Sequence, residues 1–169
     1  MNSTSYRYNF IKALIFLFVF MINQTYAGRI EILNVSPNLI FVLVLCGALI
    51  ENKTSNISYS LIFGLLFDFF NGKILGVYTI LFVGIPFVLS ELYHNYFENM
   101  TTVQTFFSMM GCLLYSFFLA MFFGLKDGGF VSLFLRVSLV EFVYNAILSI
   151  VVTVIYKKIL IIRKSAWRI

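Results

Sequence analysis

Residues 103–124 read VQTFFSMMGCLLYSFFLAMFFG, an uninterrupted stretch without any Asp, Glu, Lys or Arg. A helix needs roughly 20 mainly apolar residues to cross the hydrocarbon core of a bilayer. Five further apolar stretches accompany it, at about 10–27, 37–50, 58–70, 74–92 and 130–155. The sequence therefore predicts an all-α integral membrane protein with about six transmembrane helices, in a single transmembrane domain over residues 1–169.

The composition points to the same solvent. Apolar residues make up 61% of the chain and charged residues 11%, whereas soluble domains carry roughly 25% charged residues. The net charge of +5 does not indicate nucleic-acid binding, because five of the twelve basic residues follow the last apolar stretch: Lys157, Lys158, Arg163, Lys164 and Arg168. We therefore expect membrane lipid, and no nucleic acid, as a partner.

The first three stretches differ from an ordinary transmembrane segment in length or in the sequence that follows them. The second and third are short for a full crossing, so they must tilt, borrow polar flanking residues or thin the bilayer locally. Tyr26-Ala27-Gly28 after the first stretch is compatible with a signal-peptidase site, and the alternative interpretation is a retained first helix. The connections between stretches are brief, which predicts antiparallel helix hairpins.

The distribution of Lys and Arg predicts the topology. With the N-terminus inside, the inner side holds Arg7, Lys12, Lys53 and the five tail residues, against Arg29, Lys73 and Lys126 outside. Because cytoplasmic loops carry the excess of basic residues, we expect a multi-pass membrane protein with both termini cytoplasmic.

No catalytic, cofactor-binding or metal-binding residue can be assigned. His94 is the single histidine, in an expected loop, and triad-type nucleophilic catalysis needs a histidine beside a serine or cysteine. The sequence contains no Cys-x-x-Cys pair, no His-Glu-x-x-His motif and no phosphate-binding glycine loop. We therefore expect no enzyme and no cofactor.

The informative residues are polar groups inside the apolar stretches, where a charge needs a partner. Asp68 shares one helix face with Ser60 and Gly64, and Glu141 forms a stripe with Asn145 and Ser149. The helix directions place one polar cluster in the outer half of the membrane: Asn38, Asp68, Arg136, Glu141 and Asn145. We expect this cluster to clamp helices two, three and six. Its role stays open between a structural network, which is favoured, and a binding site. A proton path is disfavoured because no other helix supplies a relay.

Three segments resemble the rod shape-determining protein MreD family: SPNLI at 36–40, GLLFDFFNGKILG at 64–76 and EFVYN at 141–145. Their order and spacing fit across nearly the whole chain. Val140 stands where the family usually has a proline or another helix-opening residue, so the start of the last helix is less defined.

The resemblance includes the first stretch and so favours a retained first helix. It implies a protein of the bacterial cytoplasmic membrane that acts as a non-enzymatic scaffold or regulator of the cell-wall elongation complex and controls rod shape. The implied partners are an MreC-like protein and, through it, the MreB filament, the RodA glycosyltransferase and its transpeptidase. It also implies a fold similar to the substrate-binding subunits of energy-coupling-factor transporters. The alternative is therefore a vitamin-binding subunit of such a transporter, although residues 13–17 (ALIFL) lack the usual Ala-x-x-x-Ala docking patch.

Overall fold

The protein is seen in a computed structural model that describes residues 3–26, 37–51, 53–71, 75–97, 101–127 and 134–166. Side chains are described at 10–25, 37–51, 56–71, 75–97, 102–123, 134–135 and 137–158. The elements are α1 (Ser3–Tyr26), α2 (Leu39–Ile50), α3 (Lys53–Asn71), α4 (Val77–Tyr96), α5 (Thr101–Asp127), the short π-helix η2 (Phe134–Ser138) and α7 (Leu139–Ala166). All the regular structure in these ranges is helical, which confirms the all-α prediction.

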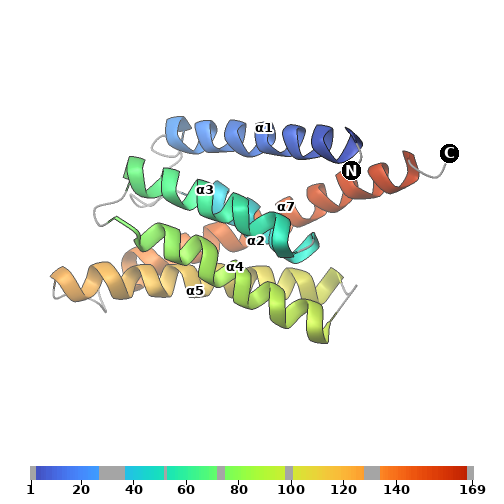
Figure 1. Ribbon diagram of the computed structural model, residues 1–169. Coiled ribbons are helices and arrows are strands. Elements are labelled where there is room, and N and C mark those ends of the chain that lie inside the picture. The colour runs from blue at the N-terminus through green and yellow to red at the C-terminus, as the bar shows by residue number, and fades with distance from the viewer. Residues whose placement is uncertain are drawn as a thin grey trace.

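The α-helices form a bundle in which successive helices run in opposite directions (Figure 1). As a result, the start of α1 and the end of α7 lie at the same end of the molecule, on the right of Figure 1. We call this the terminal end, and we call the other the opposite end. α2, α4 and α7 begin at the opposite end, whereas α1, α3 and α5 begin at the terminal end.

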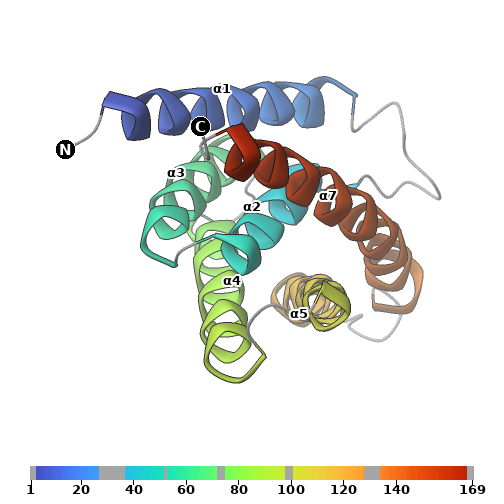
Figure 2. The same cartoon turned by 90° about the vertical axis from the view of Figure 1, so that its right-hand side faces the viewer.

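α2 is the centre of the bundle. Its sequence, LIFVLVLCGALI, is apolar on every side, and residues 40–49 are all buried. A helix that is hydrophobic all round is stable only when it is surrounded. α2 packs against α1, α3, α4, α5 and α7, and Figure 2 shows it between α1, α4, α5 and α7. Its twelve residues are therefore an inner element covered by the longer helices.

Three helical segments in the described part of the chain are long and apolar enough to cross a membrane: Val77–Tyr96, Thr102–Phe123 and Leu139–Lys158. Phe10–Thr25 and Leu39–Ile50 are shorter apolar helices. Large apolar side chains are exposed on α1, α3, α4, α5 and α7, as expected where lipid replaces water as the solvent. Six crossings remain a prediction.

The helix ends differ from the predicted ranges where polar residues extend a helix. α3 begins at Lys53 instead of about 58, because polar residues form its first turn. α7 continues to Ala166 instead of about 155, through Lys157 and Lys158. Its start is preceded by the π-helix, so the regular α-helix begins at Leu139 instead of about 130. Hydropathy marks the apolar centre of a helix better than its ends.

α1 lies obliquely across the outside of the bundle, whereas α5 is seen nearly end-on in the same view (Figure 2). Aromatic rings join α1 to α3: the Phe16 ring centroid lies 5.2 Å from that of Tyr59 and 5.4 Å from that of Phe63. Much of α1 remains exposed, including Phe10, Leu14 and Phe18. α1 is therefore a peripheral helix, and its attachment depends on few contacts.

α3 and α4 approach each other closely at Gly64. A Cβ atom on Gly64 would lie 2.9 Å from the Cα atom of Thr79 and 3.2 Å from the Cβ atom of Phe82. Small residues allow such backbone approach between helices in membranes. The close approach brings the end of α3 to the start of α4, where Asp68 lies.

Candidate functional site

Asp68 caps the first turn of α4. Its carboxylate accepts hydrogen bonds from the backbone N–H groups of Tyr78 at 3.0 Å and Thr79 at 2.8 Å, and from the Thr79 hydroxyl. Gly76, the residue before α4, makes no side-chain capping bond and has φ +96°, a left-handed conformation that favours glycine. A carboxylate near a helix N-terminus also offsets the helix dipole. Asp68 therefore supplies from α3 the cap that α4 lacks.

Asn38 organises the start of α2. Its side-chain oxygen accepts from the backbone N–H of Phe41 at 3.1 Å, and its own backbone N–H donates to Asn145 Oδ1 at 3.0 Å. Its Nδ2 donates to the Tyr115 hydroxyl at 2.7 Å. These three polar residues, Asn38, Tyr115 and Asn145, form what we call the Asn38 cluster, which joins α2, α5 and α7.

α1 contributes a further cap at the same place. The backbone N–H of Leu39 donates to Asn23 Oδ1 at 2.9 Å. Three N–H groups at the start of α2 are thus satisfied by side chains, one from α1, one from α7 and one from Asn38 itself. In an apolar environment each unsatisfied group would be costly.

Glu141 lies one turn before Asn145 on α7 and is 8% exposed. It makes no hydrogen bond to the groups that the structure describes. Tyr78 lies close enough to interact electrostatically with both Glu141 and Asp68, and Tyr115 lies close enough to Glu141. Glu141 is therefore a buried acid among aromatic hydroxyls.

The predicted polar cluster is thus distributed over two groups of bonds. Asn38 and Asn145 are in direct contact, whereas the bonds of Asp68 go to α4. The clamp that Asp68 forms joins α3 to α4, a pair that the sequence analysis did not propose. The side chain of Arg136 lies outside the described residues, so its pairing with Asp68 or Glu141 stays a prediction, as does any functional role of the cluster.

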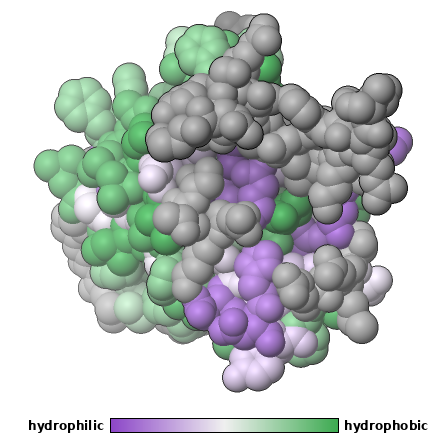
Figure 3. Space-filling view, turned by 45° about the vertical axis from the view of Figure 1, so that its right-hand side comes forward, coloured by the Kyte–Doolittle hydropathy of each residue, from purple (hydrophilic) through white to green (hydrophobic). Residues whose placement is uncertain are grey.

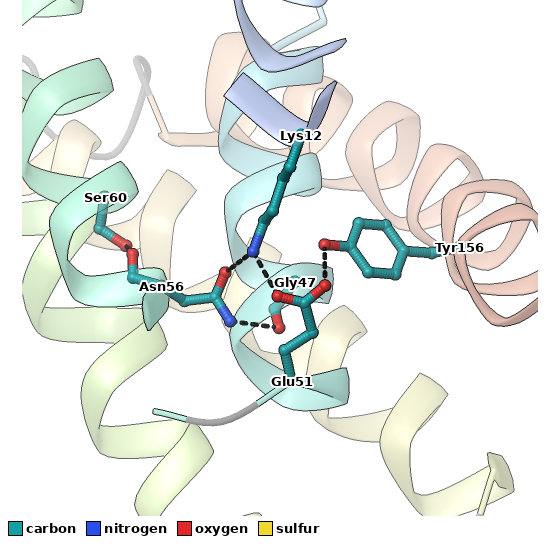
Figure 4. A network of polar contacts seen from close by, with 6 residues as sticks. All are labelled: Lys12, Gly47, Glu51, Asn56, Ser60 and Tyr156. Carbon is teal, nitrogen blue, oxygen red and sulfur yellow. Dashed lines mark hydrogen bonds and ion pairs between the residues drawn. The ribbon is translucent and has the colours of Figure 1, made fainter. Parts of the chain in front are cut away.

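A second polar region, which the sequence analysis missed, surrounds Lys12 (Figure 4). The Lys12 ammonium forms an ion pair with Glu51 and donates to Asn56 Oδ1 at 2.7 Å. Tyr156 donates to the other Glu51 oxygen at 2.9 Å, and Asn56 Nδ2 donates to the Gly47 carbonyl at 2.8 Å. We call this the Lys12–Glu51 network: Lys12, Gly47, Glu51, Asn56, Ser60 and Tyr156.

The Lys12–Glu51 network is buried and joins four helices. Lys12 is 4% exposed and Glu51 12% exposed, so both charges are withdrawn from the solvent around the bundle. The Lys12 ammonium also lies 4.6 Å from the Tyr59 ring centroid, which adds a cation–π contact. α1, α2, α3 and α7 all contribute, so this network is the main polar attachment of the peripheral α1.

Lys12 and Glu51 escaped prediction because each lies at the edge of an apolar stretch. There a charged residue suggests a solvated flank. The spacing of Lys12 within the first stretch was the available signal, since it is followed by an apolar run with no charge before Arg29.

The view that brings the terminal end forward shows hydrophilic residues gathered between areas of hydrophobic surface (Figure 3).

His94, the single histidine, lies in the last turn of α4. Within the described residues, no group of three or more His, Cys, Asp or Glu side chains could hold a metal ion. The polar groups of the two regions described above satisfy helix ends and join helices.

Comparison with known families gives one match to report. The family model for rod shape-determining protein MreD matches residues 4–159 of this chain. No curated protein and no solved structure matches it. The match runs from α1 to the part of α7 just beyond Tyr156, and therefore includes both polar regions.

Proposed function

Because the chain belongs to the rod shape-determining protein MreD family, we propose that it is a membrane scaffold or regulator of the bacterial cell-wall elongation complex. The family implies a role in determining rod cell shape, and it is a membrane family with no known enzymes. We further propose that this chain has no catalytic activity of its own and acts by holding other components in place.

The observation that carries the proposal is the extent of the family match. It runs from the first turn of α1 into α7 and includes both buried polar regions, instead of one short motif. The described polar groups support the non-enzymatic part, because Asp68, Asn38 and Glu51 are engaged in capping and in joining helices. Such bonds stabilise a bundle whose outside is free to contact other membrane helices.

We propose an MreC-like protein as the direct partner. The MreB filament, the RodA glycosyltransferase and its transpeptidase would be reached through it. The exposed apolar side chains of α1, α3 and α5 offer surface for a partner helix. In lipid, such contact depends on close packing and interhelical hydrogen bonds.

We further propose that both termini lie in the cytoplasm. The start of α1 and the end of α7 lie at one end of the bundle (Figure 1), and the excess of Lys and Arg favours the inner side for that end. A phosphatase fused after Ile169 should be inactive, whereas a fluorescent protein fused there should fluoresce. Strong periplasmic phosphatase activity would contradict this topology.

The fold similarity to substrate-binding subunits of energy-coupling-factor transporters also remains a proposal. The alternative function, binding of a vitamin for such a transporter, gains no support from the family match.

Depletion tests the proposed function in cells. In a rod-shaped host, loss of this protein should give wide or round cells, and re-expression should restore rods. The tagged protein should co-purify from detergent extracts with an MreC-like protein, while a membrane protein of similar abundance should not. Normal rods after depletion, together with no wall-synthesis partner, would contradict the proposal.

A further inference from the structure

α7 carries a buried polar stripe longer than the sequence analysis recognised. Its members recur at every fourth position, so they share one helix face. They are Glu141, Asn145, Ser149 and Thr153. The last three are no more than 1% exposed. The stripe extends about 18 Å along the helix, at 1.5 Å per residue.

α5 faces it with a second stripe of the same spacing, although the sequence analysis expected no relay from another helix. Its members are also no more than 1% exposed. They are Gln104, Ser108, Cys112 and Ser116. The two helices pack together in opposite directions (Figure 1), and Ser108 donates to the Ser149 hydroxyl at 3.3 Å. Because the two helices are antiparallel, the position of this bond indicates which other members of the two stripes lie at the same height in the bundle. We call the two stripes together the α5–α7 seam.

Hydrogen-bonding capacity in the seam is unused. Gln104 Nε2, Ser116 Oγ and Asn145 Nδ2 are buried and have no hydrogen-bond partner among the described groups. These atoms are distributed along the length of the seam and belong to both helices. Buried polar atoms left in this state are the usual partners of internal water.

The seam has an ionisable group at each end. Glu141 lies at the opposite end of the molecule. Towards the terminal end, Thr153 Oγ1 lies 3.3 Å from Cys46 Sγ. One turn later on α7, the Tyr156 hydroxyl donates to Glu51. Polar side chains therefore lie at successive turns of α7 between the buried Glu141 and the partly buried Glu51.

We propose that the α5–α7 seam is a hydrated path that carries protons between Glu141 and Glu51. A proton binds a Glu141 carboxylate oxygen and passes to a neighbouring water. Each water or hydroxyl then accepts one proton and releases another, until a Glu51 oxygen takes one up and releases one at the terminal end. Only O–H bonds form and break, so no oxidant or other reactant is needed.

The groups around Glu141 suit this role. Among the described residues, Tyr78 from α4 and Tyr115 and Cys112 from α5 are titratable side chains close enough to interact with it electrostatically. The Asp68 carboxylate accepts hydrogen bonds from the start of α4. The described surroundings of Glu141 thus contain no competing carboxylate in direct contact.

Proton flux into vesicles tests the proposal. Purified protein is reconstituted into vesicles that enclose a pH-sensitive dye, and a potassium gradient with valinomycin supplies the driving voltage. Wild-type vesicles should acidify faster than protein-free vesicles. Acidification no faster than that of protein-free vesicles would overturn the proposal and leave the scaffold role untouched.

Variants locate the path. Glu141→Gln removes the titratable group. Gln104→Leu replaces an amide whose nitrogen has no partner among the described groups with an apolar side chain of similar size. Both variants should reduce the flux to that of protein-free vesicles. Ser90→Ala is the matched control. Ser90 is also buried, and its hydroxyl has no partner among the described groups, but it lies on α4, outside the seam. Flux that survives both seam variants would overturn the proposal.

Chemical modification of the wild-type protein avoids dependence on how the variants fold. A hydrophobic carbodiimide reacts with protonated carboxyl groups inside membranes. It should add mass to the peptide that contains Glu141 and abolish the flux in parallel. Complete modification of Glu141 with undiminished flux would be equally decisive against the path.

Discussion

The two buried polar regions differ in chemistry and in what they hold. The Lys12–Glu51 network is built on an ion pair and joins helices side by side. The Asn38 cluster and Asp68 act mainly on backbone N–H groups at the starts of α2 and α4. One region therefore attaches a peripheral helix, and the other satisfies helix ends inside an apolar environment.

This difference predicts different responses to mutation. Removing one member of a buried ion pair leaves the other charge without compensation. Removing one of several capping bonds leaves the remaining bonds in place. The two regions should therefore be separable by the size of the loss of stability.

The largest loss of unfolding free energy is expected for Lys12→Met. Breaking a buried ion pair typically costs about 3–5 kcal/mol of unfolding free energy, and we expect the lower part of that range because lipid-embedded residues find substitute partners. Thermal unfolding in detergent measures the change. Lys158→Met is the control, since Lys158 is an exposed lysine on α7. Equal effects of the two substitutions would show that Lys12 is not held in a buried pair.

Gly64→Ala is expected to cause the second largest loss of unfolding free energy. The added methyl group would lie 2.9 Å from the Cα atom of Thr79, so α4 must move, and overpacking of this kind typically costs about 1–3 kcal/mol. Gly84→Ala is the matched control on α4, because a Cβ atom there meets nothing within 4 Å. If the two substitutions destabilise equally, the close approach of α3 and α4 is wrong.

Asp68→Ala should cost about 1 kcal/mol, the usual loss for a helix cap. Asp68→Asn should cost less, because one side-chain oxygen can still accept from Tyr78 or Thr79. Hydrogen exchange at the start of α4 is the local readout, and it should increase more in the alanine variant. Exchange that increases elsewhere but not at 77–80 would contradict a capping role.

The smallest effect is expected for Tyr115→Phe in the Asn38 cluster. It removes the hydroxyl that accepts from Asn38 Nδ2, and polar contacts between membrane helices average roughly 0.6 kcal/mol. The other bonds of Asn38 remain, so the unfolding temperature should fall only slightly. A loss as large as that of Lys12→Met would remove the distinction between the two regions.

The sequence was sufficient for the helical class. It also drew attention to polar residues at the opposite end, whose grouping in one cluster with Arg136 stays a prediction. Asn38, Asp68 and Asn145 interrupt or border apolar stretches, and a polar residue in such a place needs a partner. Hydropathy also located α4, α5 and α7, which have enough apolar residues to cross a membrane. It could not say that Asp68 acts on α4, because that depends on the three-dimensional approach at Gly64.

Lys12 and Glu51 show what sequence patterns leave out. Thirty-nine positions separate them, and each is typical of a flank that contacts water or lipid headgroups. Their pairing depends on how α1 crosses α2, which no local pattern specifies. The polar face of α5 was missed for a related reason: Gln104, Ser108 and Ser116 are scattered among apolar residues, and their alignment matters only once α7 lies opposite.

The central claim is that a direct charged contact between α1 and α2 holds the terminal end together, and a double-mutant cycle tests it most directly. The cycle compares the unfolding free energies of Lys12→Met, Glu51→Gln and the double variant in detergent. If the two side chains are in contact, the double variant should lose less unfolding free energy than the two single variants lose together. The difference should be at least about 1 kcal/mol. Losses that add within about 0.5 kcal/mol would show that the two residues act independently, and the ion pair would have to be abandoned.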